Sequence, residues 1–275
     1  MSDPYLDPQS GILRNKLGLT DQDSLHREEA NAVYVRSMLL KLNPIKGNFD
    51  SVHLQQIHEN LFQDVYAWAG QFRTIDMFKL DQNRHPPMTR FTPTDSIERE
   101  LGETFKRLSQ DGFLAGLEPK DFARKAAGLL SDINRIHPFR EGNGRAQRHF
   151  VRQLSESVGH RLRFEVISKE RMIQASILSA NGDVTMMERL TEEIVSEERV
   201  RPTEKVIDFF ERQGFPWNDH YIAGTRPGQD YAGTFAGRGG TNSYFRDEQN
   251  RILVGNMKDL ENEPNPGDAI TFTAR

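Results

Sequence analysis

The sequence contains no cysteine among its 275 residues. Disulfide bonds, thiolate catalysis and cysteine-based zinc sites are therefore excluded. No apolar run approaches the roughly 20 residues of a membrane span, and the acidic, polar N-terminus is unlike a signal peptide. The net charge of −4 provides no general attraction to nucleic acid or anionic membranes. Hydrophobic residues at 36% and charged residues at 28% are typical of a globular protein with one large domain or two smaller ones.

Residues 137–148, His-Pro-Phe-Arg-Glu-Gly-Asn-Gly-Arg-Ala-Gln-Arg, are the most informative stretch of the chain. Apolar residues recur at helical spacing on both sides of this motif, so we expect it to lie on a turn between two helices. The upstream set is Phe122, Ala126, Leu129, Leu130, Ile133 and Ile136, and the downstream set is Phe150, Val151, Leu154 and Val158.

The second half of the motif predicts a phosphate site. Gly142 and Gly144 allow close backbone approach and left-handed angles, and Asn143 tolerates such angles and offers an amide. Successive N–H groups at a helix N-terminus bind anions. Arg145 and Arg148, three residues apart, point to similar sides of the helix and can bind outer phosphates.

Two further motif residues supply a base and a metal ligand. Glu141, surrounded by positive charge, is best explained as a ligand of Mg²⁺ that bridges the phosphates. His137 can accept a proton from an incoming hydroxyl. Taken singly, a glycine pair after a helix is most often a cap and a histidine before proline is usually structural. The combination within twelve positions favours a functional site.

The motif resembles the Fic-domain signature, His-x-Phe-x-Asp/Glu-Gly-Asn-Gly-Arg-x-x-Arg, at every specified position. The resemblance extends to the segments 53–58, 61–70 and 73–77. The opening, with Asp3-Pro-Tyr-Leu-Asp-Pro and Asn15-Lys-Leu-Gly-Leu, is similar to Fic proteins linked to conjugation-type type IV secretion, including the Bartonella effector group and related toxins. The resemblance therefore implies a protein that is made in the bacterial cytoplasm and can be translocated into a host or recipient cell.

The resemblance implies transfer of AMP from ATP to a Ser, Thr or Tyr hydroxyl of a target protein. His137 would deprotonate the hydroxyl, residues 142–144 would hold the reacting phosphate, Glu141 would hold Mg²⁺, and Arg145 and Arg148 would hold pyrophosphate. Doc-type phosphotransferases carry Lys where this chain has Gly144, which favours nucleotidyl transfer here. UMP transfer, phosphocholine transfer and AMP removal use the same scaffold. An inactive Fic-fold interaction scaffold is an alternative of another class, and a metal hydrolase is a weaker one, because His53 and His58 are five residues apart.

The predicted fold is a mainly α-helical Fic domain with a short β-hairpin flap, followed by a small OB-like β-barrel. The residue pattern predicts helices at 23–42, 51–67, 93–110, 119–135, 144–158, 168–180, 183–198 and 203–213. Strand-like residues 74–78 begin the flap, and residues 1–20 form an arm with little regular structure. A composition shift near Arg201-Pro202 divides the chain into domains 1–200 and 201–275.

The C-terminal segment contains predicted strands at 230–236, 243–245, 252–254 and 269–273. From Thr203 onward there are 8 Lys and Arg residues against 11 Asp and Glu residues, so nucleic-acid binding is not expected. The aromatic residues Tyr231, Phe235, Tyr244 and Phe245 are expected in the core of a spacer or docking domain. The last strand pattern runs almost to Arg275, so the natural protein is expected to continue.

The flap is expected to bind the target by strand addition, as the resemblance implies. Ile75, Met77, Lys79, Asp81 and Arg84 are its candidate docking residues, and a solvated hairpin tip is the equally weighted alternative. A host small GTPase or a bacterial topoisomerase subunit is a plausible target at family level.

In this family an inhibitory Ser/Thr-x-x-x-Glu-Gly/Asn helix places its Glu on the second motif arginine. Ser24-Leu-His-Arg-Glu28 lacks the following Gly or Asn, so we expect a small antitoxin-like inhibitor in trans.

Overall fold

The computed structural model describes residues 3–80 and 88–275 of the chain. Internal contacts divide the chain into two compact units, Met1–Leu162 with Ser176–Glu192, and Arg163–Ala175 with Glu193–Arg275. The predicted boundary between residues 200 and 201 stays a prediction. No helix in the described part of the chain is both long and apolar enough to cross a membrane.

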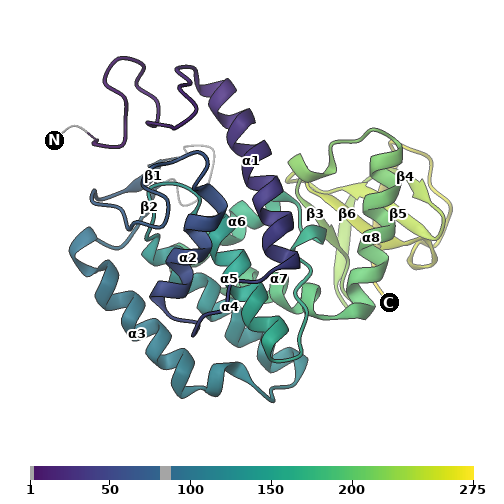
Figure 1. The fold of residues 1–275 in the computed structure, drawn as a ribbon. Helices are drawn as coiled ribbons and strands as arrows, with labels where there is room; N and C mark the ends of the chain where they lie inside the picture. Colours follow the sequence, from purple (N-terminus) through teal and green to yellow (C-terminus); the bar gives the residue numbers. More distant parts are fainter. Residues whose placement is uncertain (1–2, 81–87) are drawn as a thin grey trace. The chain divides into compact units, whose positions relative to one another are not determined.

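Five helices form the body of the first unit (Figure 1). They are α1 Gln22–Leu42, α2 Ser51–Phe62, α3 Ile97–Gln110, α4 Pro119–Ile136 and α5 Asn143–Ser157. Helix α2 packs against α1 and α5, and α4 packs against α3 and α5. The predicted apolar stripe of α4 is buried, including Phe122, Ala126 and Ile133, so the helical periodicity is confirmed. This packing fixes the end of α4 relative to the start of α5.

Helix α2 is shorter than the predicted helix 51–67. It ends at Phe62, and the chain continues as turns in which the N–H groups of Val65 and Tyr66 both donate to the carbonyl oxygen of Phe62. These turns bring Val65, Tyr66 and Trp68 into the core. The apolar residues that suggested a longer helix therefore lie in turns after α2, and these turns place their side chains in the core.

The flap contains two antiparallel strands, β1 Phe78–Leu80 and β2 Met88–Arg90, with Lys79 opposite Thr89. The prediction that the strand begins at 74–78 was wrong, because the chain from residue 74 to 77 is bent and the ladder starts at Phe78. Asp81 and Arg84, two of the predicted docking residues, lie outside the described residues.

The N-terminal arm has little regular structure, as predicted. A single bridge joins Leu6 to Leu13. The carboxylate of Asp3 accepts two hydrogen bonds from the guanidinium of Arg140, at 2.8 and 3.1 Å. The ring of Tyr5 packs edge-on against Trp68, with 5.3 Å between ring centroids. The contact of Asp3 attaches the arm to the motif loop, which we define as residues 137–142, and the contact of Tyr5 attaches it to the turns after α2.

Three further helices follow, α6 Lys169–Ala180, α7 Thr185–Val195 and α8 Glu197–Arg212. The predicted helix 203–213 begins earlier than expected, because α8 starts at Glu197 and contains Pro202. Proline has no N–H and therefore removes one hydrogen bond of the helix. Val206 and Phe210, buried one turn apart, keep the helix packed beyond this point.

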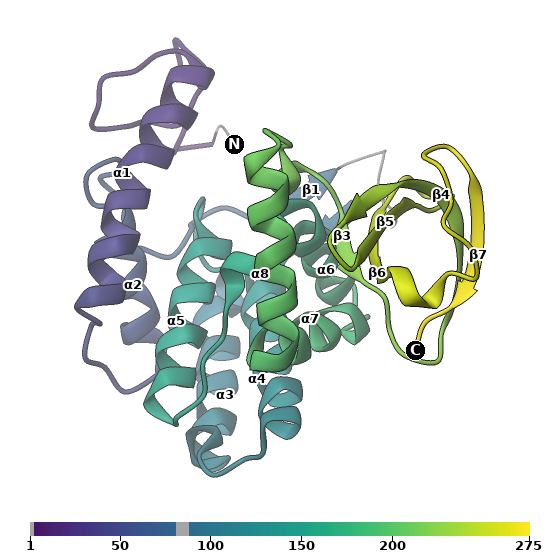
Figure 2. The same cartoon turned by 90° about the vertical axis from the view of Figure 1, so that its right-hand side faces the viewer.

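The second unit contains a five-stranded sheet in the order β3-β6-β5-β4-β7 (Figure 2). The strands are β3 Ile222–Gly224, β4 Asp230–Gly239, β5 Asn242–Arg246, β6 Ile252–Asn256 and β7 Ala269–Thr273. Four of them match the predicted strands, whereas β3, which pairs in parallel with β6, was missed. Phe235 and Phe245 are buried in one core cluster, against which Tyr231 packs, and Tyr244 is buried in a second cluster, so their predicted core role is confirmed.

Candidate active site

The motif loop connects α4 to α5, as the sequence predicted. His137 ends α4 in a left-handed conformation with φ 52°, and Gly142 precedes α5 with φ 81°. A β-carbon on Gly142 would lie 2.2 Å from Cζ of Phe62. Glycine is thus required at position 142 by both its angle and the close approach of the Phe62 ring.

The His137 imidazole is buried and has a defined orientation. Its ring stacks on Phe91 with 3.7 Å between centroids and 14° between planes. Its Nδ1 lies 3.3 Å from the carbonyl oxygen of Asn134, which can only accept a hydrogen bond. Nδ1 therefore carries the proton in the neutral ring, and Nε2 remains available as an acceptor.

The charge state of His137 follows from the same environment. Burial lowers the pKa of His137 well below 6.5, and the positive charges of Lys79 and Arg73 lower it further, against the hydrogen bond to Asn134. The ring is accordingly neutral at physiological pH. A neutral imidazole with a free Nε2 can accept a proton from a hydroxyl.

Arg73 holds the backbone around His137. Its guanidinium, which is fully buried, donates to the carbonyl oxygens of His137 at 2.8 Å and Ile75 at 2.7 Å. It also donates to the carbonyl oxygens of Thr92 and Ile136. One side chain thus joins the motif loop to both ends of the flap segment, and sequence reasoning did not identify this role.

Asn143 has a structural role that sequence reasoning did not identify. Its amide oxygen accepts from the N–H of Phe139 at 2.9 Å, and its amide nitrogen donates to the carbonyl oxygen of Phe139 at 2.7 Å. The side chain therefore closes the motif loop. The N–H groups of Asn143 and Gly144, in the first turn of α5, have no acceptor within the described residues. Such groups at a helix N-terminus can bind an anion.

Arg145 is anchored on one side. Its Nη2 pairs with the buried carboxylate of Glu29 on α1 and lies 3.4 Å from Oε1 of Glu141. The guanidinium carbon lies 4.6 Å from the centre of the Phe62 ring. Within the described residues, Nη1 and Nε have no recorded partner. Arg145 can therefore present these donors to an anion.

Arg148 has no hydrogen-bond or ion-pair partner in the described part of the chain. Loss of hydration, together with the positive charges of Arg145 and Arg152, lowers the pKa of Arg148 to about 10, so it still carries its charge near pH 7. A β-carbon on Gly144 would lie 3.1 Å from Nη1 of Arg148. The guanidinium therefore lies against the start of α5, beside the unpaired N–H groups.

Glu141 lies at the edge of this positive region. Its Oε1 accepts from the N–H of Gly142 at 2.9 Å, and 43% of the side chain is exposed. Across residues 3–80 and 88–275, no three His, Asp or Glu side chains form a cluster that could hold a metal alone. Mg²⁺ usually takes one or two carboxylates, substrate phosphates and waters, so one exposed carboxylate beside a phosphate site fits this ion.

His58 supports the motif loop from α2. Its Nδ1 accepts from the N–H of Gly70, so its Nε2 must donate to the carbonyl oxygen of Glu141, at 2.9 Å in each case. The ring stacks on Phe139 with 3.8 Å between centroids. Burial lowers the pKa of His58 to about 4, which keeps the ring neutral. These contacts give His58 a packing role rather than a metal-binding one.

Comparison with known proteins identifies this arrangement. Residues 48–155 match the model of the Fic/DOC family. A probable protein adenylyltransferase of Escherichia coli K12 is 35% identical over 71% of this chain and 93% of its own length. The chain belongs to the Fic/DOC family. A protein adenylyltransferase of Bartonella henselae is 32% identical over 98% of this chain. The chain spans about half of that relative's length, 52%.

Solved structures of Fic proteins share the fold. The type IV secretion system effector protein BepA superposes with a TM-score of 0.86 at 31% identity, over 98% of this chain and 95% of its own. BepC of Bartonella tribocorum, a VirB-translocated effector crystallised with AMPPNP, has a TM-score of 0.62 at 30% identity, over 69% of this chain and 95% of its own. The helical Fic fold with a small hairpin is thereby confirmed.

The structure brings the predicted motif residues together on one loop and one helix turn. The loop between α4 and α5 carries His137, Glu141 and Gly142, and α5 carries Asn143, Arg145 and Arg148. Ile75, Met77 and Lys79 lie in the flap segment instead. Sequence reasoning missed the supporting residues Glu29, Tyr66, Arg73 and Phe91, because no local spacing connects them with the motif.

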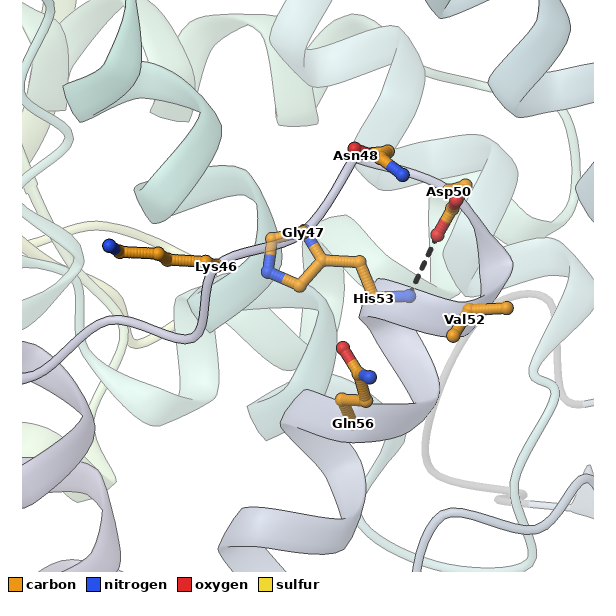
Figure 3. A pocket seen from close by; sticks show the side chains of 7 residues that line it. All are labelled: Lys46, Gly47, Asn48, Asp50, Val52, His53 and Gln56. Atoms are coloured by element: carbon orange, nitrogen blue, oxygen red, sulfur yellow. Dashed lines mark hydrogen bonds between the residues drawn. The ribbon is translucent and has the colours of Figure 1, made fainter.

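A surface pocket of about 350 Å³ lies elsewhere in the first unit (Figure 3). Lys46, Gly47, Asp50 and His53 are among its lining residues, and the N–H of His53 donates to Asp50 at 2.8 Å. No residue of the 137–148 motif lines it. The pocket is therefore separate from the Fic motif.

The lowered pKa of His137 predicts the pH dependence of the reaction. A histidine of ordinary pKa 6.5 would be only about one quarter neutral at pH 6. Because the pKa of His137 is lowered, its neutral form persists to lower pH, and the transfer rate should change less than about twofold between pH 6 and 8. Initial rates at saturating MgATP measure this. A rate that halves near pH 6.5 would show an unperturbed base.

Proposed function

We propose that this chain transfers AMP from ATP to a Ser, Thr or Tyr hydroxyl of a target protein. The observation that carries the proposal is a neutral, oriented His137 on the same loop as unpaired N–H groups and two arginines. The names of the relatives, protein adenylyltransferases, and the AMPPNP bound to BepC support the same reaction and nucleotide.

Each motif residue has a separate role in the proposed reaction. Nε2 of His137 accepts the proton of the acceptor hydroxyl, whose oxygen attacks the α-phosphorus. A new P–O bond forms as the bond to the β-phosphate oxygen breaks, and pyrophosphate leaves. The N–H groups of Asn143 and Gly144 stabilise charge on the reacting phosphate, and Arg145 and Arg148 bind the leaving group.

Gly144 supports nucleotidyl transfer over phosphoryl transfer. Any β-carbon at this position would approach Nη1 of Arg148 to 3.1 Å, closer than most such contacts. A longer side chain would displace the guanidinium from the start of α5. Glycine therefore keeps Arg148 available for the leaving phosphates.

Product analysis tests the proposed function. The purified chain, incubated with ATP and a protein target, should release pyrophosphate in amounts equal to the AMP that becomes attached to protein. Inorganic phosphate with protein phosphorylation would indicate kinase-like transfer. If ATP binds but neither pyrophosphate nor inorganic phosphate is released, an inactive scaffold is favoured.

Glu141 would hold Mg²⁺, which neutralises phosphate charge when it is bound. Replacement of Glu141 by Gln keeps the shape and removes the charge. We expect the Mg²⁺ concentration for half-maximal transfer to rise by about tenfold or more, as for loss of a charged ligand. Metal titrations of the two proteins measure this. If Glu141→Gln transfers AMP normally without raised Mg²⁺, Glu141 has a structural role only.

The flap is proposed to bind the target by strand addition. Phe78 and Leu80 on β1 are exposed by 61% and 65%, which leaves apolar side chains available to an added strand. The proposed docking residues are Ile75, Met77, Lys79, Asp81 and Arg84. A host small GTPase or a bacterial topoisomerase subunit remains the proposed class of target.

The inhibitor is proposed to come from a separate antitoxin-like protein. The nearest internal candidate, Glu28, has a side chain that is 48% exposed and pairs with Arg27. We therefore expect the purified chain to modify itself without a partner, and Glu28→Ala to leave that rate unchanged. Automodification near zero, restored by Glu28→Ala, would place the inhibitor on α1.

The C-terminal unit is proposed to be an OB-like barrel that acts as a spacer or docking domain. The curvature of its sheet in Figure 2 and the pairing of β4 with both β5 and β7 support this assignment. The domain division at residues 200 and 201 belongs to the same proposal. BepA is named a type IV secretion effector. By analogy we propose that this chain is made in the bacterial cytoplasm and translocated to another cell.

A further inference from the structure

Glu29 is a buried carboxylate outside the Fic motif. It lies on α1 with 6% of its surface exposed, and α1 precedes the motif by about a hundred residues. Burial of an ionised carboxylate is unfavourable unless the charge is paired and hydrogen-bonded. Among the described residues, Glu29 satisfies both conditions through the side chains of Arg145 and Tyr66.

The two oxygens of Glu29 have separate partners. Oε1 pairs with Nη2 of Arg145, and Oε2 accepts a hydrogen bond from the hydroxyl of Tyr66. Burial and the carboxylate of Glu29 raise the pKa of Tyr66, so its hydroxyl stays protonated and donates. Because Tyr66 occupies one oxygen, the carboxylate is held with the other directed at Arg145.

Arg145 is restrained from three sides by this arrangement. The pair with Glu29 fixes Nη2, the ring of Phe62 lies under the guanidinium, and Glu141 approaches the same nitrogen at 3.4 Å. Nη1 and Nε, for which the described residues offer no partner, are left for a ligand. A planar guanidinium that is held at one nitrogen presents its other donors in a fixed direction.

We infer that Glu29 and Tyr66 are positioning residues, which hold Arg145 in the orientation that binds the β- and γ-phosphates of ATP. This inference rests on the proposed function, because it uses the assignment of Arg145 to the leaving phosphates. Neither residue touches the nucleotide itself. Their effect should therefore require the side chain of Arg145 and the presence of the outer phosphates.

Nucleotide affinity, measured by calorimetry on the full chain, tests the inference. Glu29→Gln keeps the volume but removes the charge, and it should raise the Kd of MgATP by about tenfold, as expected for loss of a charge-assisted pair. Tyr66→Phe removes only the hydroxyl and should raise it by about threefold. The Kd of AMP, which lacks the outer phosphates, should change by less than about twofold in both variants. A variant that is merely less well folded would lose affinity for both nucleotides.

A double-mutant cycle separates action through Arg145 from other effects. In an Arg145→Ala background, Glu29→Gln should have less than about twofold further effect on the Kd of MgATP. Glu28→Gln, at the exposed neighbouring position, is the matched control and should behave like the parent.

Three outcomes would overturn the inference: equal loss of ATP and AMP affinity, a full effect of Glu29→Gln without Arg145, or tighter ATP binding by Glu29→Gln. The last would show that Glu29 competes with phosphate. Failure of the proposed function is recognised separately, because the unmodified chain would then bind ATP without AMP transfer or would not bind ATP.

Discussion

Replacement of His137 by alanine is expected to lower the rate of AMP transfer by at least about 10²–10⁴-fold, the range for removal of a general base. The affinity for ATP should stay close to that of the parent chain. The reason is that His137 contacts the loop backbone and the Phe91 ring, whereas the proposed phosphate ligands are the first turn of α5 and the two arginines. The loss therefore belongs to the attack of the hydroxyl and not to nucleotide binding.

Single-turnover transfer rates and ATP titrations of the same preparation measure both quantities. His149→Ala provides a control on the next helix, because that residue is also a buried histidine but lies outside the motif loop. If His137→Ala keeps substantial transfer, the histidine is not the base. If it loses ATP affinity in proportion to its rate, its role is in binding.

Replacement of Arg73 by alanine is expected to destabilise the first unit by about 3 kcal/mol or more. Four backbone carbonyl oxygens would lose their donor, and each buried unsatisfied acceptor costs about 1–3 kcal/mol. That is a large part of the roughly 5–15 kcal/mol by which domains are stable. Transfer should also fall, because the carbonyl group of His137 is one of the four.

Denaturant unfolding gives the change in the free energy of unfolding. Arg124→Ala is the control, because Arg124 pairs with Asp121 at 2.7 Å but is 62% exposed. Exposed pairs contribute about 0–1 kcal/mol, so this variant should remain near the parent. Equal stability of the Arg73 and Arg124 variants would contradict the proposed bracing of His137.

Local sequence patterns were sufficient to predict a feature when all of its residues lie in one helix or loop. The apolar spacing from Phe122 to Ile136 predicted α4, and the glycines and arginines after it predicted a phosphate site at the start of α5. The family resemblance added the reaction. The prediction of α4 is confirmed, whereas the phosphate site and the reaction stay predictions, which rest on motif residues that are consecutive in sequence and therefore close in space.

Residues that act from distant parts of the chain could not be found in this way. Glu29 reaches Arg145, and Arg73 reaches the carbonyl group of His137, only after α1, α2 and the flap have packed. Asn143 was assigned to ligand binding because its conformational tolerance was visible in the sequence. Its hydrogen bonds to Phe139 were not visible there. The predicted helix 203–213 started after Pro202, but α8 begins at Glu197, and its buried residues Val206 and Phe210 lie beyond the proline.

The most direct test of AMP transfer uses two preparations of ATP, one labelled at the α-phosphate and one at the γ-phosphate. The purified chain is incubated with each in Mg²⁺, and the label that remains covalently attached to protein is counted. We expect attached label from the α-labelled ATP only, and none of it with His137→Ala. Attached label from the γ-labelled ATP, or equal labelling by the parent and His137→Ala, would contradict AMP transfer by the Fic motif.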